Sequence, residues 1–141
     1  MQRNRRRGLL CLVIGMGLGM VILSPHSYGY NALVPHMIAN LNRLQNIVVG
    51  IAMSDFERVA EEAGGLVTNG KVIRGLVGIV VTDNDAQKSA AFQNLAHELE
   101  EHAEKLQAAA NQRHEKEVRH ELSEVLEYCI KCHQQFRDEA R

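Results

Sequence analysis

Aromatic residues are scarce in this chain, and so are cysteines. The 141 residues include no Trp, three Phe and three Tyr, which leaves a largely aliphatic interior. The three cysteines are Cys11 near the N-terminus and Cys129 and Cys132 near the C-terminus. Because there is no second cysteine pair, a structural zinc site would lack its remaining ligands. The two C-terminal cysteines are therefore expected to have a role other than in a structural zinc site.

Only one long apolar run is present, and it lies near the N-terminus. Residues 1–7 contain four arginines, and the fifteen-residue apolar run Leu9–Leu23 follows them. Fifteen residues are too few for a comfortable membrane span, whereas a basic segment before an apolar run is typical of a secretory signal peptide. The small residues Ser27 and Gly29 indicate a cleavage site before Tyr30.

Cleavage at this site predicts a signal peptide, residues 1–29, and a single exported domain, residues 30–141. We expect that domain to be periplasmic and to have no membrane span; an uncleaved anchor is the alternative. Cleavage removes Cys11 and leaves 12 Lys and Arg against 17 Asp and Glu, a net charge of −5 with histidines neutral. A negative surface argues against nucleic acid as a partner and is compatible with a basic partner face.

The sequence Cys129-Ile130-Lys131-Cys132-His133 is the C-x-x-C-H pattern of covalent c-type haem attachment. Each thiol can add to a haem vinyl group, and His133 is then positioned to ligate the iron. A thiol–disulfide centre and half of a zinc site are the rival interpretations. The thioredoxin-type motif follows a strand, whereas this one lies late in a helical pattern. The histidine directly after Cys132 also favours one covalently bound haem c.

Apolar residues recur at steps of three or four along four segments, which predicts four helices. Pro35 is expected in the first turn of the first helix. Residues 54–57 (Ser-Asp-Phe-Glu) are expected to form a capping box that opens the second, and Gly64-Gly65 to end it. Residues 66–83 suggest a hairpin around Asn69-Gly70, but we favour an apolar connection packed over the bundle. The apolar stripe of the first helix is Met37, Leu41, Leu44, Val48 and Ile51.

The third helix is expected to be capped by Asp83 or Asp85 and to end near Asn111. Its acidic residues, Glu100 among them, are expected on the solvent side, and both C-terminal cysteines fall on the apolar face of the fourth helix. The predicted fold is therefore all-α, an up-down four-helix bundle with haem attached to the C-terminal helix. The inward stripes are Phe92, Leu95, Leu99, Ala103 and Leu106 in the third helix, and Val118, Leu122, Val125, Cys129, Cys132 and Phe136 in the fourth.

Residues 129–137, with an aromatic and a basic residue after the histidine, resemble the class II cytochromes c, the cytochrome c′ type. The resemblance implies a left-handed four-helix bundle, with haem on the last helix and the first helix over the distal face. Members carry electrons or bind small gases such as nitric oxide and carbon monoxide. Helix-paired homodimers occur among them.

Function in this family divides on the sixth iron position. Met37 is the eighth residue of the expected exported domain and lies on the apolar stripe, where a thioether ligand would raise the potential. The alternatives are that Met37 is simple core packing, that the sixth position is open, or that His36 is the ligand. His36 is disfavoured because its helical face carries Asn40 and Arg43 and is expected to be wetter. Met53 lies beyond the helix.

Arg137 lies one turn beyond His133, so the resemblance places it near the proximal face, and a solvated C-terminal arginine is the alternative. Phe136 is expected to pack against haem. Four other histidines of the expected domain are at spacings that diverge on a helix, and we expect them to be solvated or at the bundle edge. They are His97, His102, His114 and His120.

The sequence therefore predicts an exported monohaem c-type cytochrome that transfers single electrons, with His133 proximal and Met37 distal. It is not expected to be an enzyme, and its redox partner protein is not identified. The first alternative is a five-coordinate gas-binding haem protein. The second is an interaction bundle without haem, in which Cys129 and Cys132 form a disulfide.

Overall fold

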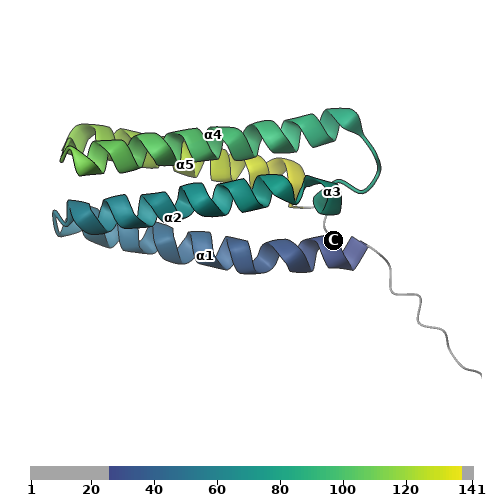
Figure 1. Cartoon of the computed structure of the whole chain (residues 1–141), viewed down its shortest axis with the longest axis horizontal. Helices are drawn as coiled ribbons and strands as arrows, with labels where there is room; N and C mark the ends of the chain where they lie inside the picture. The colour runs from purple at the N-terminus through teal and green to yellow at the C-terminus, as the bar shows by residue number, and fades with distance from the viewer. Residues whose placement is uncertain (1–25, 138–141) are drawn as a thin grey trace, which may run out of the picture.

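The structure, a computed structural model, describes residues 26–137, and their side chains from residue 32. The predicted all-α fold is confirmed, since these residues contain helices and no strand. Four long helices lie alongside one another in alternating directions, and a single short helix, α3, lies at one end (Figure 1). The helices are α1 (His26–Ala52), α2 (Phe56–Gly75), α3 (Val77–Val80), α4 (Ala86–Asn111) and α5 (Glu115–Phe136).

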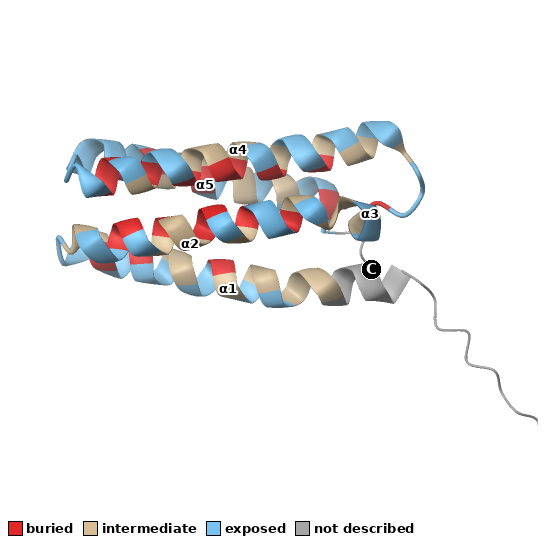
Figure 2. Cartoon of the chain, in the orientation of Figure 1, coloured by how far each residue is buried: buried red, intermediate tan, exposed pale blue. Residues whose placement is uncertain are grey.

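The buried residues lie on the helix faces that look inward, as Figure 2 shows in red. The main cluster is aliphatic, as the shortage of aromatic residues predicted, and its largest members include Ile47, Leu66 and Leu106. A second cluster contains Phe92 and Phe136, whose rings meet edge to face with centroids 5.3 Å apart. The second cluster joins α4 to the last turn of α5, so it fixes the C-terminal end of the bundle.

α1 begins earlier than expected. It starts at His26, so Pro35 lies inside the helix and not in its first turn. The proline costs one backbone hydrogen bond, and the residues before it continue the helix without it. Residues 1–7 and the apolar run Leu9–Leu23 lie outside the described residues. The expected cleavage site after Gly29 falls within the first turns of α1 as the structure describes it.

The predicted capping box at residues 54–57 is wrong by one residue. Ser54 adopts a left-handed conformation (φ 56°) and ends α1, with hydrogen bonds from Ser54 N to Ile51 O (3.1 Å) and from Asp55 N to Gly50 O (2.8 Å). Asp55 is therefore the N-cap of α2, and its carboxylate accepts a hydrogen bond from the backbone of Arg58.

The expected end of the second helix at Gly64-Gly65 is also wrong, because α2 continues to Gly75 and includes most of the predicted connection. These glycines mark close approaches to other helices. The Arg43 guanidinium of α1 occupies the space that a Cβ at Gly65 would fill, and the Gln107 amide of α4 does the same at Gly64. Glycine in this helix thus permits contact between helices, at the cost of helix propensity.

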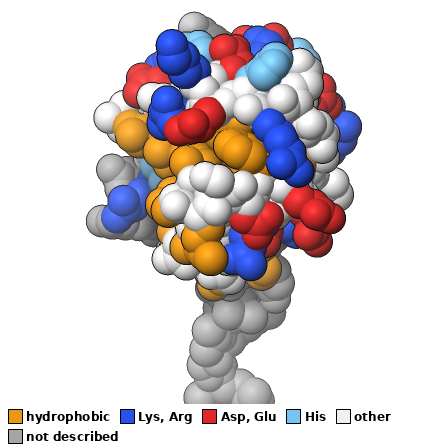
Figure 3. Space-filling view, turned by 90° about the vertical axis from the view of Figure 1, so that its left-hand side faces the viewer, with side chains coloured by type: hydrophobic (Ala, Val, Ile, Leu, Met, Phe, Trp, Pro, Cys, Tyr) orange, Lys and Arg blue, Asp and Glu red, His pale blue; other side chains and the backbone are white. Residues whose placement is uncertain are grey.

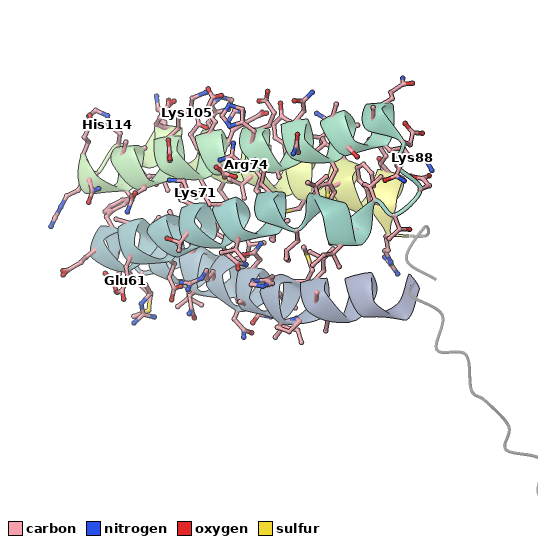
Figure 4. All side chains as sticks on the ribbon, turned by 45° about the vertical axis from the view of Figure 1, so that its right-hand side comes forward. Glu61, Lys71, Arg74, Lys88, Lys105 and His114 are labelled. Carbon is pink, nitrogen blue, oxygen red and sulfur yellow. The ribbon has the colours of Figure 1, made fainter. Side chains whose placement is uncertain are left out.

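The predictions for the last two helices are largely confirmed. Asp85 caps α4 through hydrogen bonds from the backbone of Gln87 and Lys88, and α4 ends at Asn111 as predicted. Glu100 is an exception, because it is buried and not on the solvent side. It lies over Gly70 and its carboxylate forms an ion pair with Arg74 Nε (3.1 Å), which reaches across from α2 (Figure 4).

We predict that Gly70→Ala destabilises the holoprotein by about 1–3 kcal/mol, because the added Cβ would lie 2.7 Å from Glu100 Cγ and displace a buried, ion-paired side chain. Gly75→Ala is the matched control in the same helix, since a Cβ there has no neighbour within 4 Å among the described residues. The control should gain about 0.4–1 kcal/mol. Urea denaturation measures both changes, and equal effects at the two positions would contradict the close contact.

Candidate functional site

α5 brings together the residues of the C-x-x-C-H motif. Cys129 and Cys132 are one turn apart and half-buried, and both are free thiols. His133, one turn after Cys129, has an exposed side chain that also lines the same cavity as both cysteines. A helix places residues three and four apart on one face, so the motif presents two sulfurs and an imidazole in one direction.

That direction is the open side of the bundle. α1 packs against α2, α2 against α4 and α4 against α5, whereas α1 and α5 make almost no direct contact over the described residues. A cavity of about 130 Å³ lies there, and a second of about 390 Å³ adjoins it. Met37, Cys132 and His133 line both cavities, so the two form one crevice between α1 and α5.

The walls of this crevice are almost entirely apolar. The first cavity is lined, besides the motif, by Met37, Asn40, Leu41, Leu44, Ile73, Leu95, Ala96, Leu99 and Tyr128. The second is lined by Leu33, Val34, Met37, Ile38, Phe92, Phe136 and Arg137 in addition to Cys132 and His133. The described residues contain no group of three or more His, Cys, Asp or Glu side chains placed to hold a metal ion. The crevice therefore suits a large apolar group that brings its own metal and is tethered through sulfur.

Burial controls the chemistry of the two thiols. Removal from water raises the pKa of the Cys129 thiol to about 11, and the neighbouring Cys132 adds to the shift. Burial likewise raises the pKa of Cys132. Both sulfurs are neutral thiols at physiological pH, and thiols in this form are poor nucleophiles.

The structure places the other predicted site residues around the second cavity. Phe136 is buried against Phe92, so its main contact is with the protein core. Arg137 is exposed, lines the cavity and donates its backbone N–H to the carbonyl of His133 (3.1 Å). Met37 is half-buried on the opposite wall, on α1.

Two histidines differ from expectation. The face of His36 is not wet, because Asn40 on that face is 6% exposed and His36 Nδ1 is 2.6 Å from Asn69 Oδ1 of α2. His102 is not solvated either. Its Nδ1 lies 2.7 Å from the carboxylate of buried Glu121, and its ring stacks on Tyr128 at 5.2 Å between centroids. His97, His114 and His120 are exposed as predicted.

Among the wall residues that sequence reasoning missed, two carry polar groups. Asn40 lies three residues after Met37 and shares its face, and Tyr128 directly precedes the first cysteine of the motif. The helical spacing from Met37 already contained the signal for Asn40, but its polarity suggested a solvent-facing position.

Comparison with known families agrees with the site. The family model described as cytochrome C′ matches residues 85–137, which span α4, α5 and the whole motif. Over this segment the chain is similar to the cytochrome c′ family. No curated protein and no solved structure matches it.

Cytochromes c′ hold one covalently attached haem c with its iron, so the match supports a monohaem c-type cytochrome. The family consists of electron-transfer and gas-binding haem proteins, which are not typically enzymes. The crevice between α1 and α5 fits this cofactor, because it has apolar walls and two sulfurs on one face. The matched segment supplies the motif, and α1 supplies the opposite wall from outside that segment. None of the helices in residues 26–137 is long and apolar enough to cross a membrane.

We predict that the thiols of the haem-free chain react slowly with iodoacetamide under native conditions at pH 8. The difference between a pKa of 9.0 and one of about 11 lowers the thiolate fraction of Cys129 about a hundredfold. In 8 M urea the rate of modification of Cys129 should rise by about that factor, and that of Cys132 should also rise. Equal rates in the two conditions would contradict burial of the thiols.

Proposed function

We propose that the crevice holds haem c through thioether bonds to Cys129 and Cys132, with His133 as the proximal ligand and Met37 as the distal ligand. The protein would then transfer single electrons. The observation that carries the proposal is that Met37 and His133 lie on facing helices and line both cavities of one crevice.

The surroundings of Met37 support a ligand role. Leu33, Leu41 and Leu44 flank it on the crevice wall and make that side of the site apolar. A dry, apolar environment disfavours the extra positive charge of ferric iron, and thioether ligation favours the ferrous state in the same direction. Both effects raise the reduction potential, which suits an electron carrier.

Arg137 and Phe136 have different roles in this proposal. Arg137, exposed at the edge of the second cavity, brings a positive charge beside His133 and further disfavours ferric iron or meets a haem propionate. Phe136 holds the end of α5 against Phe92 and keeps the motif in register with the crevice. Replacement of Phe136 would therefore act through packing.

We also propose that the functional protein is the exported domain, residues 30–141, in the periplasm. The family is typically exported, which supports this assignment. Figure 3 shows one end of the bundle, where acidic and basic side chains are interspersed around apolar ones. That end does not present a region of charge of one sign.

We predict that Met37→Ala converts a six-coordinate, low-spin absorption spectrum into a high-spin one and allows carbon monoxide to bind readily. Met53→Ala is the matched control, because Met53 lies just beyond α1 with 70% of its surface exposed. The control should leave the spectrum unchanged. A wild-type spectrum that is already high-spin would reject Met37 as ligand and favour the gas-binding alternative.

We predict that the protein recovered from the periplasm begins at Tyr30 and carries the mass of one haem after denaturation. Intact-mass spectrometry measures both properties at once. Replacement of Cys129 and Cys132 together by Ala should remove the added mass without changing the N-terminus. A colourless wild-type product with a Cys129–Cys132 disulfide would exclude haem attachment.

A further inference from the structure

One polar side chain lies in the part of the crevice wall that α1 forms. Asn40 of α1 is 6% exposed and lines the first cavity together with Met37, Leu41 and Leu44. Burial of an amide is costly unless its hydrogen-bonding groups are satisfied. A leucine would complete the wall without that cost, so the presence of an amide at this place requires an explanation.

The partners of Asn40 are fixed by an interhelical network. Asn69 of α2 donates both amide hydrogens, one to the backbone carbonyl of His36 (2.9 Å) and one to Asn40 Oδ1 (2.6 Å). The Oδ1 atom of Asn69 accepts a hydrogen bond from His36 Nδ1 (2.6 Å). Every group of the Asn69 side chain is therefore used.

This network also determines which way each amide faces. The carbonyl of His36 can only accept, so the nitrogen of Asn69 must face it, and the same nitrogen then faces Asn40. Asn40 must in turn present its oxygen to Asn69. Its amide nitrogen has no hydrogen-bond partner among the described residues and belongs to a side chain that lines the crevice.

We infer that Asn40 is a hydrogen-bond donor on the distal side, and that its amide N–H groups donate to the ligand in the sixth iron position. Residues three apart on a helix have neighbouring side chains, so Asn40 lies next to the position assigned to Met37. The inference rests on the proposed function in one respect, namely that α1 covers the distal side of the haem. Its role is to set the preference for ligands: a donor stabilises an anionic or strongly polar ligand and does little for an apolar one.

The test compares two ligands in the holoprotein. In Met37→Ala, we measure the affinity of the ferric protein for azide and of the ferrous protein for carbon monoxide, before and after Asn40→Leu. Loss of a hydrogen bond to an anion should weaken azide binding by about tenfold or more, while carbon monoxide affinity changes by less than about twofold. Leu44→Ala, on the same wall, is the packing control and should leave the azide-to-carbon monoxide ratio unchanged.

Other outcomes overturn the inference. Equal losses for azide and carbon monoxide would indicate altered packing, and no loss for either would mean that Asn40 donates elsewhere, for example to a propionate. If Asn40→Leu does not fold, the azide and carbon monoxide affinities are measured in Asn40→Ala instead, and the same change in their ratio is expected. If the wild-type iron is five-coordinate, Met37 ligation fails by itself, and the same comparison is then made directly with and without Asn40→Leu.

Discussion

The arrangement depends on α1 standing apart from α5 while it remains firmly packed on α2. Packing in this bundle runs in series from α1 through α2 and α4 to α5, and the last side of the square is left open. Polar contacts hold α1 in place on α2. Arg43 Nη1 and Asn46 Nδ2 lie 3.1 and 2.7 Å from the two carboxylate oxygens of Glu62. Nearer the N-terminus of α1, Asn69 of α2 is hydrogen-bonded to both His36 and Asn40. These contacts are directional, so they orient α1 on α2 more closely than aliphatic packing alone would.

The sequence predicted the helices and the motif because both are local properties. The spacing of Phe92, Leu99 and Leu106 needs no partner to be recognised, and neither does the order of two cysteines and a histidine. Glycine misled the prediction, since Gly64-Gly65 reads as a helix end when only the chain itself is considered. Glycine is present at these two positions because the side chains of Arg43 and Gln107, from α1 and α4, occupy the space that a Cβ would fill. The same holds for the connection predicted over residues 66–83, most of which is simply the continuation of α2.

Buried polar residues were the second source of error, and for a related reason. Glu100, His102 and Asn40 each lie on a helical face that the sequence pattern predicts to be exposed to solvent. Each is instead buried or half-buried against a neighbouring helix, and their partners are Arg74, Glu121 and Asn69, respectively. Periodicity separates polar from apolar faces but does not state which polar groups will meet across an interface. His102 stacks on Tyr128, a wall residue of the crevice, so one of these pairs supports the site itself.

The burial of both sulfurs has a consequence for the order in which the protein is assembled. Thioether formation requires reactive sulfur, and in the folded haem-free chain both thiols are half-buried and protonated. Porphyrin attachment is therefore expected to be faster before α5 has packed against α4, when both sulfurs are in water. On this view the cofactor is in place while the helices pack around it, and a chain that folds first presents its sulfurs in their less reactive form.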